Sequence, residues 1–223
     1  MTPDLVIFDC DGVLIDSEVI AAEIEAEALS AVGYDVSAQD VIERFLGRPT
    51  ADVHKMVETA LGRVLPGGFG AAIDARITAA YRERLLPIPG IFDVLRKLQV
   101  PRCVASSSAP AKLVPGLLET GLLEEFYPHI FSTVLVAHGK PAPDIFQFAA
   151  AQCGANPAAT VVVEDSPSGV EAGRRAGMTV IGFTGGAHCR PGHAERLRAG
   201  GAHAIVRHFD GFHDTLHDLC QAC

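Results

Sequence analysis

The chain has 223 residues, enough to bury a substantial core as one large domain or two small ones. Its 48% hydrophobic content is typical of a globular protein and argues against disorder. A formal net charge of -9, without a basic stripe, argues against nucleic acid and anionic membrane surfaces as partners. No run approaches the roughly 20 apolar residues of a membrane-spanning helix, and the N-terminus lacks a signal-peptide pattern. We therefore expect a soluble, cytoplasmic protein.

The segment VIFDCDGVLIDSE, residues 6–18, contains the end of the first predicted strand and two aspartates directly after it. Residues 5–8 form a short, continuous apolar run, which is typical of a strand buried on both faces. Ligands of open α/β sheets bind beyond the carboxyl ends of the strands, where Asp9 and Asp11 are expected to lie. Two carboxylates this close repel each other unless a cation or a shared proton relieves them. A simple turn at Asp11 and Gly12 also explains the pattern.

The next part of the chain predicts helices and almost no strand. Both EVIAAEIEAEALSAVG, residues 18–33, and AAIDARITAAYRERLL, residues 71–86, carry apolar residues at helical spacing. Pro87, Pro89 and Gly90 then mark a boundary. We expect a helical insert that interrupts another domain.

From about residue 88 onward, apolar strands alternate with helices, which predicts an α/β fold with a doubly wound, Rossmann-like parallel sheet. The expected domains are an α/β core from residues 1–16 and 85–223, and an inserted helical cap domain at residues 17–84. The alternating segments are RCVASS, AKLVPGLLETG, IFSTVLV, DIFQFAAAQCG, TVVVED, SGVEAGRRAG and MTVIGF.

Three further strand ends or adjoining loops carry polar residues that suit a binding site. Each has an ordinary explanation: the serines and acids can cap helices that begin near residues 110 and 168, and the lysine can be a solvated loop residue. Four such positions at the carboxyl edge of one parallel sheet, however, converge on one crevice. Besides the two aspartates, the residues are Ser106, Ser107, Ser108, Lys140, Glu164 and Asp165.

The chemistry of these side chains is complementary. Two acidic pairs suit Mg²⁺, which takes oxygen ligands and completes its shell with waters and a substrate phosphate. Serine hydroxyls, a lysine ammonium and backbone N–H groups suit phosphate oxygens. Asp9 can act as a nucleophile because the metal and Lys140 offset its repulsion from phosphate, while Asp11 can exchange a proton with the leaving or attacking oxygen.

Four segments resemble, in order, the four motifs of the haloacid dehalogenase superfamily. They are DCDGVLIDS, VASSS, GKPAPD and VEDSPSG. The resemblance implies Asp9 as nucleophile and Asp11 as general acid/base. It implies Ser106 and Lys140 as phosphate binders, and Ser107 is a further candidate. The implied magnesium ligands are the carboxylates of Asp9, Glu164 and Asp165 and the backbone carbonyl of Asp11.

The insert falls between the first and second motifs, where the sugar-phosphatase and β-phosphoglucomutase branch of this superfamily carries its cap. Within that branch, the chain looks nearest to bacterial sugar-acid phosphatases acting on 6-phosphogluconate. We therefore expect a Mg²⁺-dependent phosphoric monoester hydrolase that acts on a small phosphorylated sugar or sugar acid through an aspartyl phosphate. A monomer or small homo-oligomer is expected.

A mutase similar to β-phosphoglucomutase is the second choice for the activity. That branch leads us to expect a histidine ten residues after the acid/base aspartate and a Lys-Asn pair after the serine motif. This chain has Ala21 at the first position, and Ala109 with Pro110 at the second. Lys112 is the nearest cation in the sequence, displaced onto the following helix, and it keeps the mutase in consideration.

A receiver domain and a dehalogenase fit the motifs less well. A phospho-accepting receiver domain also uses an acidic pair, a serine or threonine and a lysine, but its acidic pair and phosphorylated aspartate lie on different strands. A dehalogenase lacks the proton-donating aspartate two residues after the nucleophile, so Asp11 argues against this activity.

Two sets of residues outside the motifs are further candidates. In the insert, Arg48 either binds an anionic part of the substrate or is simply solvated. At the C-terminus, Cys220 and Cys223 form a lone C-x-x-C with His213 and His217 nearby, a weak pattern for zinc. A C-terminal helix explains this tail better, and the cysteines are expected to be reduced.

Overall fold

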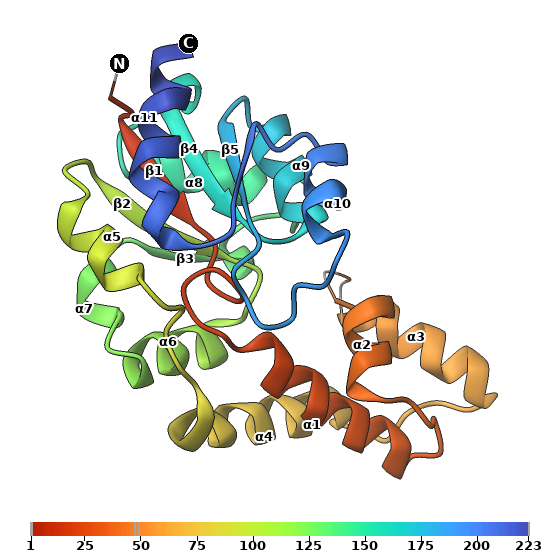
Figure 1. Ribbon diagram of the computed structural model, residues 1–223. Coiled ribbons are helices and arrows are strands. Elements are labelled where there is room, and N and C mark those ends of the chain that lie inside the picture. The colour runs from red at the N-terminus through yellow and green to blue at the C-terminus, as the bar shows by residue number, and fades with distance from the viewer. Residues whose placement is uncertain (1, 47, 49, 223) are drawn as a thin grey trace.

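The computed structural model describes residues 2–46, 48 and 50–222. Six strands form one sheet in the order β3-β2-β1-β4-β5-β6, and every neighbouring pair is parallel (Figure 1). This strand order confirms the predicted doubly wound α/β fold. The strands are β1 (Leu5–Phe8), β2 (Arg102–Ser106), β3 (Ile130–Ser132), β4 (Thr160–Glu164), β5 (Thr179–Phe183) and β6 (Ala204–Val206).

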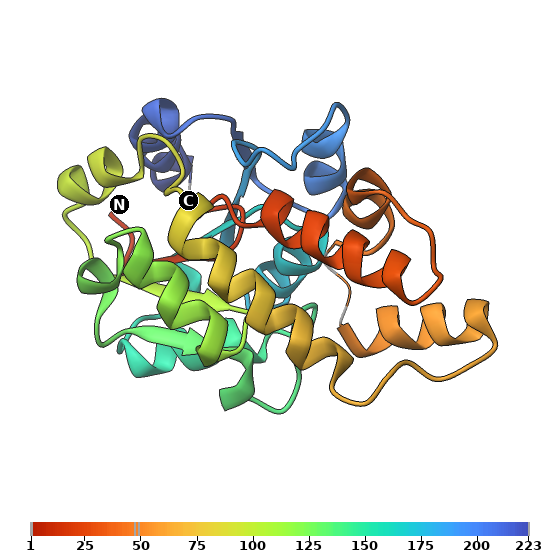
Figure 2. The same ribbon diagram turned by 90° about the horizontal axis from the view of Figure 1, so that it is seen from below.

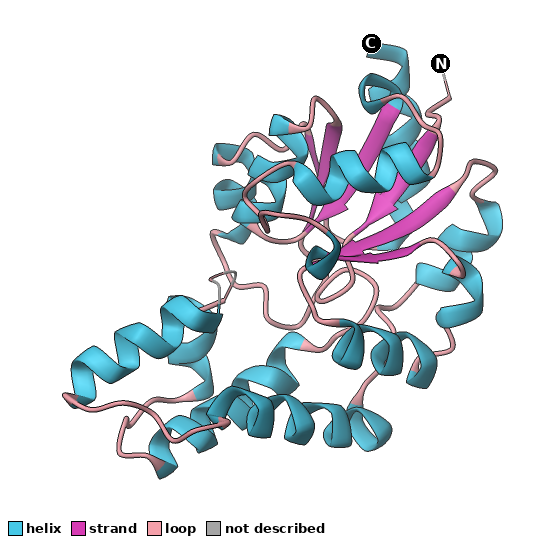
Figure 3. Cartoon of the chain, turned by 180° about the vertical axis from the view of Figure 1, so that it is seen from behind, coloured by secondary structure: helices cyan, strands magenta, loops and turns pink. Residues whose placement is uncertain are grey.

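Helices cover both faces of this sheet (Figure 3). Val6 and Phe8 of β1 belong to one hydrophobic cluster with residues of α5 and α11, whereas Leu5 and Ile7 belong to a second cluster with residues of α8 and α9. Alternate residues of one strand thus face opposite layers, which explains why β1 is apolar throughout. The core helices are α5 (Ile91–Lys97), α6 (Pro110–Glu119), α7 (Leu123–Phe126), α8 (Asp144–Gln152), α9 (Pro167–Arg175), α10 (His193–Ala199) and α11 (Phe212–Ala222).

Four helices lie between β1 and α5 in the sequence and gather beyond the carboxyl ends of the strands, away from both termini (Figure 1). Buried residues of α1, α2 and α3 form a hydrophobic cluster of their own, whereas the buried residues of α4 belong to the main cluster, and α4 packs against α1 and α6 (Figure 2). This arrangement agrees with the expected cap, although the exact domain boundaries remain a prediction. The helices are α1 (Glu18–Ala31), α2 (Ala38–Arg44), α3 (Thr50–Leu61) and α4 (Phe69–Arg84).

One predicted element is wrong in part. The apolar run at residues 130–136 suggests a full strand, but β3 ends at Ser132 and a short 3-10 helix covers Thr133–Leu135. Val134 and Leu135 are more than half exposed, so their hydrophobicity does not reflect burial in the sheet. The elements that were not predicted individually are β6, α2, α3, α5, α7 and α10.

The C-terminal tail forms α11, as expected. Cys223 lies outside the described residues, so the structure does not test its pairing with Cys220. The groups of three or more possible metal ligands found in the described ranges do not include His213, His217 or Cys220. None of the helices in these ranges is long and apolar enough to span a membrane.

Candidate active site

Asp9 follows β1 at the carboxyl edge of the sheet. Its backbone N–H donates to the carbonyl of Val163 in β4 over 2.9 Å, which continues the parallel pairing past the end of the strand. The residue is 7% exposed. A carboxylate buried to this extent requires a compensating charge or hydrogen bonds.

Lys140 supplies part of that compensation. Its Nζ lies 2.5 Å from Oδ1 of Asp9 and 2.7 Å from Oε1 of Glu164, and it donates to the carbonyl of Ala105 over 3.0 Å. Burial lowers the pKa of Lys140, but the two carboxylates raise it by more, so the ammonium stays charged. The side chain is only 4% exposed, so Lys140 is not a solvated loop lysine.

Glu164 and Asp165 follow each other at the end of β4, and both are buried. The carboxylate of Glu164 accepts hydrogen bonds from N and Oγ of Ser166, each over 3.0 Å. It lies over Gly169, where a Cβ would come within 1.8 Å of its Oε1. The capping residue of α9 is Ser166, whose Oγ accepts from the N–H of Gly169, so the alternative explanation of the two acids as helix caps is wrong.

The loop after β1 passes very close to Asp165 at Gly12. The φ angle of Gly12 is 76°, and a Cβ there would lie 2.1 Å from Oδ2 of Asp165. Glycine is therefore required both for the backbone conformation and for the approach of the two loops. Since β1 and β4 are parallel neighbours, ligand oxygens of Asp9, Glu164 and Asp165 all lie within 4.8 Å of one another.

The serines after β2 form a chain of hydrogen bonds rather than a helix cap. Ser106 is buried, and its Oγ accepts from the N–H of Ser108 over 3.0 Å. Ser108 in turn donates its hydroxyl to Oδ2 of Asp11 over 2.6 Å. The N-cap of α6 is Ala109, which makes no side-chain cap, and Ser107 is exposed. The Ser106 loop is thus connected to Asp11.

Asp11 has different surroundings from Asp9. Ser17 and Ser108 donate to its two carboxylate oxygens, each over 2.6 Å, and Nζ of Lys112 lies 3.6 Å from Oδ1. Burial by itself raises the pKa of Asp11, but Lys112 and the two hydroxyls outweigh it and lower the pKa below its usual value. Lys112 therefore does reach inward from α6.

The pKa values of two neighbouring carboxylates are shifted in the opposite direction, upward. Burial raises the pKa of Asp9 well above its usual value; Lys140 opposes this, while Glu164, Asp165 and Asp11 add to it. Burial and the charge of Glu164 likewise raise the pKa of Asp165. The cluster therefore carries more negative charge than its surroundings stabilise, which is the situation that a bound divalent cation relieves.

The predicted residues that come together are Asp9, Asp11, Ser106, Lys140, Glu164 and Asp165. By contrast, Arg48 is exposed, and its Nε donates to the carbonyl of Arg44 over 2.9 Å. Its role in binding substrate stays a prediction.

Sequence reasoning missed two contacts to this cluster. Ser17 donates to Asp11 although it lies at the start of the helical insert. His188, on the loop after β5, places Nε2 only 3.0 Å from Oδ2 of Asp165. The strand-end argument applies to β5 as well, so the segment TGGAHC at residues 184–189 was the available signal.

The parallel sheet and its edge of clustered carboxylates define a hydrolase of the haloacid dehalogenase type. The family model described as haloacid dehalogenase-like hydrolase matches residues 3–177, and the chain belongs to this family.

Known proteins similar to this chain agree with that assignment. The 6-phosphogluconate phosphatase of Escherichia coli is 28% identical over 189 residues, covering 84% of this chain and 86% of that protein. A haloacid dehalogenase-like protein of unknown function from Agrobacterium tumefaciens superposes with a TM-score of 0.87 at 38% identity, covering 97% and 99% of the two chains. A hydrolase of the same family from Deinococcus radiodurans, crystallised with bound phosphate and sodium, superposes with a TM-score of 0.79 at 32% identity. The match covers 96% of this chain and 95% of that chain. The predicted family and enzyme class, a hydrolase with phosphatases among its relatives, are confirmed, and the receiver-domain interpretation is wrong.

Proposed function

We propose that this chain is a Mg²⁺-dependent phosphatase that hydrolyses a small phosphorylated sugar or sugar acid, with Asp9 as the nucleophile. The proposal rests on the buried Asp9 carboxylate, which is paired with Lys140 and shares its cluster with Glu164 and Asp165. A carboxylate beside a fixed ammonium and a potential metal site is suited to attack phosphorus, because both cations offset its repulsion from the phosphate dianion.

The residues fit a magnesium ion. The donors are all carboxylate oxygens, they lie within 4.8 Å of one another, and burial raises the pKa of Asp9 and Asp165. We propose that Asp9, Glu164 and Asp165, with the carbonyl of Asp11, hold Mg²⁺. The ion, when bound, neutralises the acidic cluster and stabilises charge on the phosphoryl oxygens.

Lys140 and the Ser106 loop hold the phosphate in this proposal. Lys140 pairs with the phosphoryl oxygens and favours the ionised form of Asp9, because its own raised pKa keeps the ammonium charged. The buried Ser106 and the exposed Ser107 provide hydroxyl and N–H donors beside it. In the first step, Oδ of Asp9 bonds to phosphorus, and the bond from phosphorus to the sugar oxygen breaks.

Asp11 acts as the general acid and the general base in this proposal. The ionised Asp11 takes up one proton from solvent when the substrate binds and gives it to the departing sugar oxygen in the first step. In the second step it takes a proton from the attacking water, which releases phosphate and regenerates Asp9, and this proton then returns to solvent. Hydrogen bonds from Ser17 and Ser108 fix the direction of its carboxylate. As an ionised group in the free protein, Asp11 has the form that accepts the proton of water.

The proposed substrate class rests on the substrate for which one relative is named and on cations of this chain that could bind it. The relative from Escherichia coli is named for 6-phosphogluconate, which carries a carboxylate besides its phosphate. In this chain, Lys112 lies beside Asp11, and Arg48 lies in the helical segment; both are candidates for a second anionic group. The cytoplasmic location and the oligomeric state stay predictions.

The test is a panel of phosphorylated sugars and sugar acids, assayed for released phosphate with Mg²⁺ and with excess chelator. We expect phosphate release from a sugar or sugar-acid phosphate, and loss of that activity in chelator. Full turnover in chelator contradicts the magnesium site. Absence of release across the panel contradicts the phosphatase.

Lys112 also supports a second candidate, a phosphosugar mutase. Its Nζ, 3.6 Å from Asp11, offers a cation for the second phosphate of a bisphosphorylated intermediate. Against it, Ala21, which stands where we expect the mutase histidine, packs against the main hydrophobic cluster. Rapid conversion of β-glucose 1-phosphate to glucose 6-phosphate with a bisphosphate primer, with little free phosphate, selects the mutase.

A further inference from the structure

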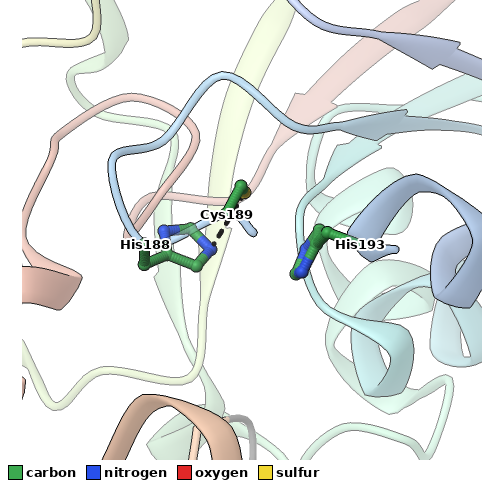
Figure 4. Close-up of side chains that lie close together, drawn as sticks. All are labelled: His188, Cys189 and His193. Atoms are coloured by element: carbon green, nitrogen blue, oxygen red, sulfur yellow. Dashed lines mark hydrogen bonds between the residues drawn. The ribbon is translucent and has the colours of Figure 1, made fainter. Parts of the chain in front are cut away.

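A second group of metal-ligating side chains lies beside the acidic cluster and has no part in the proposed hydrolysis. His188 and Cys189 come from the loop between β5 and α10, and His193 is the first residue of α10 (Figure 4). One ligand atom from each lies within 4.8 Å of those of the other two. The two imidazoles are buried, and the thiol is half-buried.

The donors suit zinc rather than magnesium. Imidazole nitrogen and thiolate sulfur are the usual ligands of Zn²⁺, whereas Mg²⁺ prefers oxygen. Bond lengths of about 2.0–2.3 Å in a tetrahedral zinc site place neighbouring donors about 3.3–3.7 Å apart. Nε2 of His188 lies 3.4 Å from Sγ of Cys189, within that range.

The fourth donor is Asp165. Its Oδ2 lies 3.0 Å from Nε2 of His188, the same nitrogen that lies 3.4 Å from Sγ of Cys189, so this imidazole connects Asp165 to the group of two histidines and a cysteine. Gly12 and Gly186 leave the room that the His188 ring occupies, because a Cβ at either position would come within 2.7 or 2.8 Å of its Cε1. We propose that His188, Cys189, His193 and Asp165 form a zinc site that inhibits the enzyme by capturing a magnesium ligand.

His193 has two existing contacts, one of which must be released when the ion binds. His193 approaches the backbone carbonyl of Asp165 through Nε2, over 2.6 Å, and NH2 of Arg196 through Nδ1, over 2.8 Å. Arg196 is exposed, so its guanidinium can turn into solvent and leave a ring nitrogen for the metal. The bond to the carbonyl then orients the ring, as the second nitrogen of a ligating histidine commonly does. Cys189 binds as the thiolate and releases its proton to solvent; no electron is transferred.

Zinc is expected to inhibit the enzyme because the two metal sites share Asp165. Asp165 belongs both to the carboxylate cluster with Asp9 and Glu164 and to the site with His188. One carboxylate held by zinc in the second site is no longer placed for magnesium in the first. This consequence rests on the proposed function, whereas the zinc site itself does not.

Binding is tested first, with Co²⁺ as a spectroscopic probe for zinc in the full-length, metal-stripped protein. We expect a thiolate-to-cobalt charge-transfer band in the near ultraviolet that zinc abolishes, and that Cys189→Ser lacks. Cys153→Ser is the matched control, because Cys153 also lies beside a histidine, with Sγ 3.8 Å from Nδ1 of His129. His193→Gln should weaken cobalt binding more than about tenfold by loss of one ligand. Absence of the band, or a band unchanged in Cys189→Ser, overturns the site.

Competition between the two ions tests the role of Asp165 without an activity assay. Excess Mg²⁺ should raise the concentration of Co²⁺ needed to develop the band in the wild type. A band that is independent of Mg²⁺ overturns Asp165 as a shared ligand.

Inhibition of phosphate release is the last measurement, with each variant normalised to its own rate in Mg²⁺. Zinc should inhibit the wild type, added Mg²⁺ should reverse the effect, and Cys189→Ser should need at least about tenfold more zinc. Equal inhibition of Cys189→Ser and the wild type means that zinc acts by replacing magnesium directly, which overturns the inhibitory role. If no substrate is turned over at all, the cobalt band still decides the site.

Discussion

The carboxyl edge of the sheet and the helical segment beyond it use the same kinds of charged residue in opposite ways. At the sheet edge, the side chain of Lys140 is 4% exposed and bridges Asp9 and Glu164. In the helical segment, Arg76 pairs with Glu27, and these side chains are 47% and 68% exposed. Exposed pairs contribute about 0–1 kcal/mol to stability, whereas removing one partner of a buried pair typically costs about 3–5 kcal/mol.

This difference indicates that the two regions have different roles, the sheet edge in the chemical step and the helical segment in the selection of substrate. Buried charges have fixed positions, because few arrangements satisfy them, and fixed positions are what bond making and breaking require. Exposed charges in the helical segment can be exchanged with little loss of stability, which suits the selection of different substrates. The expected effects of substitution therefore fall steeply from the first region to the second.

The largest effect should come from Asp9→Asn. A neutral amide cannot form an aspartyl phosphate, so kcat should fall by roughly 10⁴-fold or more. Thermal unfolding should stay cooperative, because the side chain keeps its size. Asp4→Asn, at the exposed amino end of the same strand, is the control and should retain activity. Substantial turnover by Asp9→Asn points to direct attack by water.

Asp11→Asn should come next, with an effect that depends on the substrate. For sugar phosphates, whose leaving oxygen needs a proton, we expect a loss of about 10²–10⁴-fold in kcat. Aryl phosphates leave without that proton, so their loss should be smaller. The measurement is single-turnover release of the alcohol across leaving groups of graded pKa. An equal loss for good and poor leaving groups argues against Asp11 as the general acid.

A smaller effect concerns stability at the boundary between the two regions. Burial, followed by the charge of Asp11, raises the pKa of Glu18 from 4.5 to about 7. The folded state therefore holds the proton more tightly, and stability falls as pH rises from about 4.5 to about 7. Glu18→Gln should remove this loss, gaining about 2 kcal/mol over the wild type between about pH 5 and about pH 8.

Urea unfolding in metal-free buffer at both pH values measures that gain. Glu83→Gln, at an exposed position of the same helical segment, is the control and should leave the pH dependence of the wild type unchanged. A wild-type pH dependence retained in Glu18→Gln contradicts the assignment.

The smallest effect is expected for Arg48→Ala. An exposed guanidinium that contacts a second anionic group of the substrate contributes about 0.2–1 kcal/mol, or up to about fivefold in KM. Arg63→Ala is matched, because Arg63 is also exposed and donates to a backbone carbonyl, that of Val32. Initial rates with singly and doubly anionic phosphates measure both variants. If Arg48→Ala and Arg63→Ala give the same KM values, Arg48 does not bind substrate.

The sequence was most informative where a local pattern has only one structural solution. An apolar run of four residues, too short for a helix and followed by acids and glycine, predicts a buried strand with a site at its tip, and β1 with Asp9 follows that rule. The same rule placed Lys140, Glu164 and Asp165 in one crevice, because parallel strands end at a common edge. It also predicted a full strand at residues 130–136, where exposed Val134 and Leu135 belong to a 3-10 helix.

The sequence by itself determined the parallel α/β class, the four motifs and therefore the family, since these depend on hydrophobic periodicity and on residues close together in the chain. Only the tertiary structure decided which side chains meet from different elements. Lys112 reaches Asp11 because of how α6 is oriented, and His188 reaches Asp165 because Gly12 and Gly186 leave room for its ring. Such contacts depend on helix rotation and loop conformation, which packing across the whole fold fixes and which no local pattern encodes.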